Sequence, residues 1–105
     1  MEWYRDLYLS ANARKKRDEL IQKLESGKTC VNVYLITLPH GGANQLELVP
    51  AWNLKFWYPR KSCPPVIGLA CGRDEAQELV LQIAQDVLKK SGSADIRAYF
   101  EQEMR

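Results

Sequence analysis

The segment from Val66 to Gly92 constrains the fold of this chain more than any other part of its sequence. It begins with an apolar run, Val66–Cys71, that has the length and composition of a buried strand. Asp74 and Gln77 then have the spacing of a capping box, and apolar residues follow at helical spacing: Ala76, Leu79, Val80, Ile83, Ala84, Val87 and Leu88. Gly92 is placed to end this helix. Because so regular an apolar stripe needs a surface to cover, the segment predicts a compact α+β domain in which a helix lies across a sheet.

The size and composition of the chain are those of a single domain, residues 1–105. Of its 105 residues, 46% are hydrophobic and 27% are charged, which argues against extensive disorder. The net charge is only +2, so any attraction to nucleic acid or anionic lipid has to come from a local patch. No apolar run has the length that spans a bilayer, and the first residues do not read as a secretion signal. We therefore expect a cytoplasmic protein with no membrane partner.

The cysteines and the single histidine do not form a recognisable metal or cofactor site. Cys30, Cys63 and Cys71 are an odd number and widely spaced, which fits a reducing compartment better than a disulfide framework. No two cysteines have the spacing of zinc ligands, and His40 is the only histidine. The glycines before the predicted helix match neither the dinucleotide nor the phosphate-loop motif. We expect no cofactor, no metal and no catalytic constellation.

The first 26 residues are predicted to be helical. One straight helix over Glu2–Ser26 would turn Arg14 and Arg17 toward the core side, which favours a bend or a break. Two shorter helices, Trp3–Leu9 and Ala13–Ser26, are the alternative interpretation. Candidate boundary residues are Ser10, Asn12 and Gly27.

The middle of the chain predicts a small antiparallel sheet of three or four strands. The run Thr29–Leu38 is apolar on both faces, as in a central strand, and a turn-rich stretch connects it to an alternating strand at Leu46–Val49. Residues 52–58 fit either another strand or a short helical turn, and this choice sets the number of strands. The helix Asp74–Lys90 covers the sheet in this interpretation. The N-terminal helix and a short last helix after Gly92 flank it.

Four consecutive cations form the basic cluster of the chain: Arg14, Lys15, Lys16 and Arg17. Such side chains can contact the phosphates of a nucleic acid. A second contribution could come from Lys55, Arg60 and Lys61 beside two aromatic residues. Acidic residues share the N-terminal region, so the alternative interpretation is an ordinary solvated helix face.

Aromatic residues are more numerous than one small core requires. We single out Trp3, Tyr4, Trp57 and Tyr58 as candidate partner-binding residues. The alternative is that Trp52 and Phe56 fill the core while the other aromatic side chains cover its rim. A homodimer formed through the N-terminal helix is the leading functional interpretation of the surplus.

Cys71 is the candidate reactive thiol because it lies between the last strand and the helix that follows. Backbone N–H groups at a helix N-terminus can lower the pKa of a thiol, and Arg73 would add to the effect. The alternative is a small buried apolar residue. A cysteine–histidine pair with His40 requires a three-stranded sheet that brings both residues to one edge.

These observations rank three functions. The first is a non-catalytic cytosolic module for protein binding or assembly, including self-assembly. The second is a nucleic-acid binder that uses the basic cluster, and the third is a thiol-dependent enzyme or redox sensor centred on Cys71.

Overall fold

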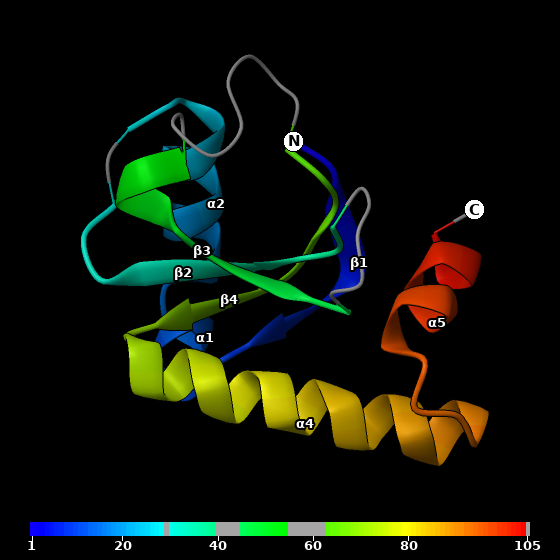
Figure 1. Cartoon of the computed structure of the whole chain (residues 1–105). Coiled ribbons are helices and arrows are strands. Elements are labelled where there is room, and N and C mark those ends of the chain that lie inside the picture. The colour runs from blue at the N-terminus through cyan, green and yellow to red at the C-terminus, as the bar shows by residue number, and fades with distance from the viewer. Residues whose placement is uncertain (29, 40–44, 55–62, 105) are drawn as a thin grey trace.

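The protein is built around a four-stranded sheet with the strand order β1-β4-β2-β3 (Figure 1). A computed structural model describes residues 1–28, 30–39, 45–54 and 63–104. The strands are β1 (Trp3–Leu9), β2 (Val33–Thr37), β3 (Glu47–Pro50) and β4 (Val66–Cys71). The helices of the described residues are α1 (Ala11–Arg14), α2 (Arg17–Glu25), α4 (Arg73–Ser91) and α5 (Ile96–Glu103), and a 3₁₀ turn, η1, spans Ala51–Asn53. The predicted α+β class is confirmed.

The predicted hairpin is confirmed, but the strand after it does not continue a meander. Strands β2 and β3 pair antiparallel, with Thr37 opposite Glu47 and Tyr34 opposite Pro50. Strand β4 also pairs antiparallel with β2, on the side away from β3. Strand β3 ends at Pro50, and η1 then turns the chain out of the sheet. Strand β4 therefore does not pair with β3 but with the other side of β2.

The predicted helix over Trp3–Leu9 is wrong, because these residues form β1 at the edge of the sheet. Trp3 pairs in parallel with Val66 and Tyr8 with Gly68, and the register shifts between them. The sheet is therefore mixed rather than antiparallel, and its fourth strand comes from the N-terminal region. Residues 51–53 adopt the helical turn that was the alternative to a strand, while residues 55–58 of that predicted segment lie outside the described residues.

The helical part of the N-terminal region begins after β1 and is broken in the middle. The Ser10 hydroxyl accepts a hydrogen bond from the Ala13 amide at 3.4 Å, which caps α1, and another from the Cys71 amide at 3.1 Å. Lys15 and Lys16 separate α1 from α2. Gly27, at φ +79°, follows the end of α2 as expected. The break keeps the charged side chains of this region at the surface while Ala13, Leu20 and Leu24 remain buried.

Apolar side chains cover both faces of the sheet, which explains why β2 and β4 are apolar on both sides. One buried cluster joins the sheet to α4 and α5; it contains Tyr4, Ile36, Leu38, Ile67, Ala70, Ala76, Leu79, Ile83, Val87 and Phe100. The other joins it to α1, α2 and η1; it contains Ala13, Leu20, Leu24, Cys30, Val33, Leu35, Val49, Ala51, Val66 and Leu69. Figure 1 shows α4 running along one side of the sheet and α2 on the other side, with α1 near the start of α4.

Helix α4 packs on the sheet with part of the apolar residues that its periodicity selects. Leu79, Ile83 and Val87 are at most 2% exposed and share a cluster with Ile36 and Ile67. Its start differs from the predicted capping box, because the N-cap is Gly72 and no side chain caps the helix. The φ of +92° at Gly72 permits the sharp turn from strand to helix. Gly92, at φ +73°, ends the helix as predicted. The described helices include none long and apolar enough to cross a membrane.

Gly68 is the point of close approach between the central strand β4, the edge strand β1 and helix α4. A Cβ at this position would lie 3.1 Å from the carbonyl oxygen of Tyr8, 3.3 Å from Cδ2 of Leu79 and 3.4 Å from Cδ1 of Ile36. The first contact is with backbone, which cannot move without moving β1. The absence of a side chain at Gly68 is therefore what lets these three elements meet.

A polar contact also joins β1 to α4. The Tyr8 hydroxyl donates a hydrogen bond to the Asp86 carboxylate, and Lys90 Nζ lies 3.1 Å from Asp86 Oδ2. The hydrogen bond from Tyr8, together with Lys90, lowers the pKa of Asp86. The pKa of Tyr8 is raised, first by burial and then by Asp86.

We expect the contacts of Asp86 with Tyr8 and Lys90 to stabilise the folded protein at neutral pH and to be lost in acid. Because the pKa of Asp86 is lower in the folded protein, its contribution is present above the unfolded value of about 3.9 and is lost as the pH falls through the folded value. Asp86→Asn should therefore lose less stability than the wild type between neutral pH and about pH 3, as measured by thermal denaturation. Asp18→Asn, at a side chain that is 92% exposed, serves as the control and should follow the wild type. Equal acid losses in the wild type and Asp86→Asn would contradict the assignment.

Candidate functional site

Helix α4 carries a second apolar stripe, beside the one it buries on the sheet. We call Val80, Leu81, Ala84 and Leu88 the open stripe. At about 100° per residue, these positions lie next to the buried face formed by Leu79, Ile83 and Val87. Leu81 is 64% exposed and Leu88 is 53% exposed. The sheet therefore covers only part of the apolar surface of α4.

A groove runs between the open stripe and the edge of the sheet. This β3–α4 groove has a volume of about 440 Å³ and is lined by Leu46, Glu47, Leu48, Gln77, Val80 and Leu81. Further along α4, a hollow of about 180 Å³ is lined by Ala84, Gln85, Leu88, Ala94 and Ile96. The two depressions lie along the open stripe, so this flank of α4 offers hollows as well as protruding leucines.

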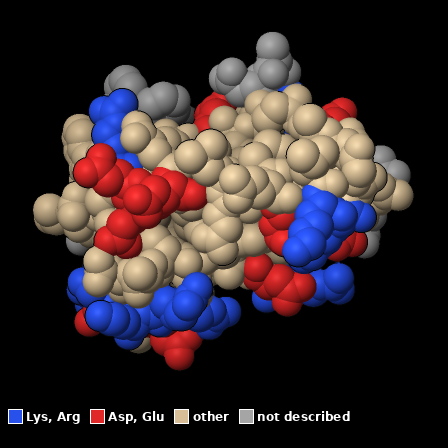
Figure 2. All heavy atoms as spheres, turned by 90° about the horizontal axis from the view of Figure 1, so that it is seen from below, with Lys and Arg blue, Asp and Glu red and all other residues tan. Residues whose placement is uncertain are grey.

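The two ends of α4 carry opposite charges. Asp74 and Glu75 lie in the first turn, followed by Glu78, while Lys89 and Lys90 lie in the last turn. Seen from the side that α4 covers, an acidic group lies at the left between basic groups, basic and acidic side chains lie together at the right, and uncharged side chains lie between the two regions (Figure 2). Glu75 accepts hydrogen bonds from Asn12, and Lys90 pairs with Asp86.

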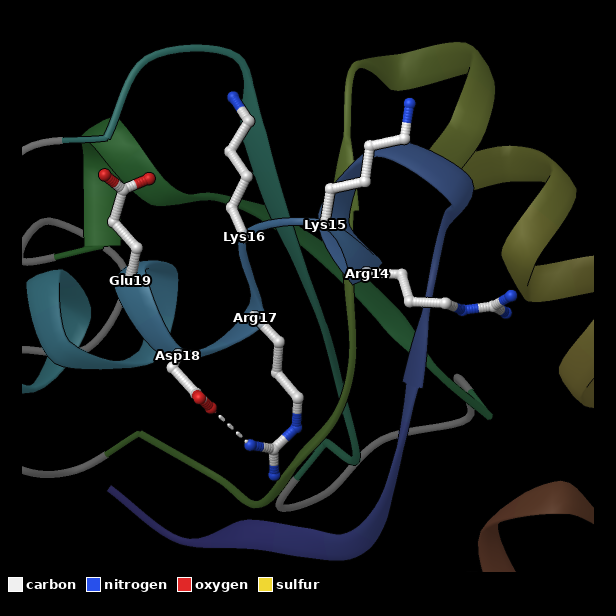
Figure 3. A pocket seen from close by; sticks show the side chains of 6 residues that line it. All are labelled: Arg14, Lys15, Lys16, Arg17, Asp18 and Glu19. Carbon is white, nitrogen blue, oxygen red and sulfur yellow. Dashed lines mark hydrogen bonds and ion pairs between the residues drawn. The ribbon is translucent and has the colours of Figure 1, made fainter.

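The basic cluster lies at the junction of α1 and α2, where it borders an open hollow of about 580 Å³ (Figure 3). Its four side chains are exposed. Arg17 Nη1 lies 2.8 Å from Asp18 Oδ1, and Lys23 Nζ lies 3.9 Å from Glu19 Oε1. The two acidic residues of the hollow, Asp18 and Glu19, are therefore paired with Arg17 and Lys23. The other cations of the basic cluster leave a local excess of positive charge, as the predicted nucleic-acid site requires.

The aromatic residues predicted to bind a partner do not form one surface in the described residues. Tyr4 is 5% exposed and packs against Phe100 in the core, so its ring has little surface to offer. Trp3 is half-buried, and its indole N–H donates to Glu25. Trp57 and Tyr58 lie outside the described residues. Trp52, expected in the core, is instead 62% exposed on η1.

Burial opposes activation of the Cys71 thiol by its position before α4. Cys71 is half-buried beside the cluster on the α1 and α2 side, and burial raises its pKa, with Lys16 acting in the opposite direction. A raised pKa leaves less thiolate at neutral pH, which is the reverse of the expected helix effect. Cys30, Cys63 and Cys71 are all free cysteines.

The topology also separates Cys71 from the end of β2. Cys71 pairs with Val33 at the start of β2, whereas Thr37 at the end of β2 pairs with Val66, five residues away along β4 and therefore about 16 Å distant. His40 lies outside the described residues, but the predicted condition for a pair, a three-stranded sheet, is not met, because the sheet of the described residues has four strands. Among the described residues, no group of histidine, cysteine or acidic side chains has the arrangement of a metal site.

The open stripe is a candidate binding surface that the sequence interpretation missed. Val80, Ala84 and Leu88 were assigned to the buried face, and Leu81 was assigned to none. The width of the apolar arc was the available signal, because residues from Leu79 to Leu88 spread over about half of the helix circumference, more than one sheet contact covers. Comparison of the chain with models of protein families, with curated proteins and with solved structures gives no match.

Proposed function

We propose that this domain is a protein-assembly module in which two copies bind each other through the open stripe of α4. The observation that carries the proposal is the exposure of Leu81 and Leu88 along a grooved flank of a helix whose other apolar side is buried. Removing such side chains from water is favourable at about 25 cal/mol per Å² of apolar surface. Exposed apolar surface arranged in a continuous strip is typical of an interaction site.

Charge complementarity favours a second copy as the partner. An antiparallel pair of α4 helices brings the acidic first turns of each copy beside the basic last turn of the other. Asp74 then faces Lys89 of the partner copy, and neither has an ion pair within the described part of the chain. A parallel pair would instead place like charges together, which costs free energy.

The antiparallel arrangement also matches shapes along the helix. When Leu81 of one copy lies opposite Ala84 of the other, the same register places Leu88 opposite Gln77, which lines the β3–α4 groove. Each copy then inserts one leucine into the groove of its partner, and the small side chain of Ala84 allows the helices to approach closely. An interface in which each patch meets its own copy has two-fold symmetry.

We expect Leu81→Asp to weaken self-association by at least about tenfold, because a two-fold interface contains the substituted position twice and each copy would bury an unpaired carboxylate. Sedimentation velocity over about two decades of concentration measures the effect. Gln82→Asp is the matched control, since Gln82 lies on the opposite flank of α4, in a hollow with Leu9 and Arg14, and should associate like the wild type.

Charge exchange tests the antiparallel register in the same measurement. Lys89→Glu alone should weaken association, and combining it with Asp74→Lys should restore it. A wild-type protein that stays monomeric at every concentration overturns the proposal. Equal weakening by Leu81→Asp and Gln82→Asp would also overturn it, because the effect would then not depend on the open stripe.

A further inference from the structure

The basic cluster holds positive charge that is not fully taken up by ion pairs among the described residues. Arg17 pairs with Asp18, but Arg14, Lys15 and Lys16 form no ion pair in the described ranges. All three are exposed and consecutive in the chain. The break between α1 and α2 places them at the junction of two short helices, beside an open hollow, rather than along one helix face. This surface shares no lining residue with the β3–α4 groove, so it is separate from the proposed assembly face.

The side chains of the basic cluster spread apart instead of converging. In Figure 3, Lys15 and Lys16 extend in one direction, Arg14 extends to the side and Arg17 points the opposite way. Side chains that converge suit a single anion, whereas a spread set suits a ligand with several negative charges at intervals. The arrangement therefore fits an extended polyanion.

The lining of the hollow indicates which polyanion it fits. All six lining residues are charged: Arg14, Lys15, Lys16, Arg17, Asp18 and Glu19. None offers an aromatic ring on which an unpaired base could stack, and none offers an apolar side chain to insert among lipid chains. Contacts to a regular phosphate backbone need neither. We infer that the basic cluster binds the phosphate backbone of a nucleic-acid duplex without reading its sequence.

Fluorescence anisotropy with a labelled duplex of mixed sequence tests this inference. We expect a dissociation constant of about 10⁻⁴ to 10⁻⁶ M. The logarithm of the association constant should fall with the logarithm of the salt concentration with a slope of about −3, because each of about three phosphate contacts contributes about −0.9. Lys15→Glu and Lys16→Glu should each weaken binding by about tenfold and reduce the slope by about one. Leu81→Asp should bind the duplex like the wild type, which separates this test from that of the assembly proposal.

Arg5→Glu is the matched control, because it changes the net charge by the same amount. Arg5 is exposed on β1 and is not among the residues that line the hollow. It should leave binding nearly unchanged. Absence of binding at low salt overturns the inference, and so does equal weakening by Arg5→Glu. Preference for a single strand of the same length, or for phosphatidylserine vesicles, would assign the cluster to another ligand and also overturn it.

Discussion

Replacing Phe100 with alanine is expected to lower the free energy of unfolding by about 3–5 kcal/mol, a large share of the roughly 5–15 kcal/mol that stabilises a domain. Phe100 is fully buried and is the main contact of α5 with the rest of the protein. Its ring meets Tyr4 at 5.1 Å and 82°, Tyr8 at 6.2 Å and 88°, and Tyr99 at 5.1 Å and 90°. Truncation therefore removes three edge-to-face contacts as well as buried area. Denaturation in urea measures the change.

Two further variants make the Phe100 experiment decisive. Gln102→Ala lies on the exposed side of α5 and should change stability by no more than about 0.5 kcal/mol. Phe100→Leu keeps most of the volume and should lose less than Phe100→Ala, which gives a measurable value if the alanine variant does not fold. A loss below about 1 kcal/mol for Phe100→Ala, typical of a surface position, would show that α5 is not docked through this residue.

Gly68→Val is expected to destabilise the protein by about 2–3 kcal/mol, for the opposite reason. Here the substitution adds volume where three elements already touch, and the nearest neighbour, at 3.1 Å, is the Tyr8 carbonyl oxygen in the backbone of β1. Gly68→Ala should lower the stability less than Gly68→Val does, because it adds one methyl group instead of three carbon atoms. Alanine also reduces the conformational entropy of the unfolded chain, which favours the folded state. Urea denaturation of the two variants should give this order.

The contact with Leu79 provides the internal control for Gly68. The end of the Leu79 side chain is flexible and lies 3.3 Å from the added Cβ, so Leu79→Ala should relieve part of the crowding. Combining Gly68→Val with Leu79→Ala should therefore cost less than the sum of the single losses. Strict additivity, or a Gly68→Val variant as stable as the wild type, would contradict the close approach of β4, β1 and α4.

The parts of the fold that the sequence predicts correctly are those in which local and long-range signals agree. In Val66–Ser91, the apolar strand, the helical periodicity and the final glycine all indicate the structure that forms. Local and long-range signals also agree in the β2–β3 hairpin, because a short turn-rich stretch separates its two strands in the sequence. The start of α4 is an exception, since Gly72 takes the N-cap position through its backbone conformation rather than through a capping side chain.

The segment Trp3–Leu9 shows why local pattern can mislead. Its large apolar residues, Trp3, Tyr4, Leu7 and Tyr8, have the spacing of a helix face, with Arg5 and Asp6 between them. In the structure this spacing arises from the shift in register between Trp3 and Tyr8, which lets the chain remain a strand while two charged residues stay exposed. The irregularity depends on β4, which local reasoning about the first residues does not include.

The candidate surfaces were predictable to different degrees. The basic cluster is visible as consecutive cations, and its exposure follows from their charge. The burial of Tyr4 depends on Phe100 in a distant helix, and the exposure of Leu81 and Leu88 depends on how much of α4 the sheet covers. These are properties of tertiary packing, so the pattern of apolar residues names the candidates without deciding which of them reach the surface.

The parallel pairing of β1 with β4 has a consequence for the order in which the chain acquires its structure. Trp3 pairs with Val66 and Leu9 with Leu69, so each partner lies about sixty residues further along the chain. During synthesis β1 is complete long before its partner exists, whereas the β2–β3 hairpin closes over a much shorter distance. Until β4 is made, the hydrogen-bonding groups of β1 remain available to any other strand nearby, including the same segment on a neighbouring nascent chain.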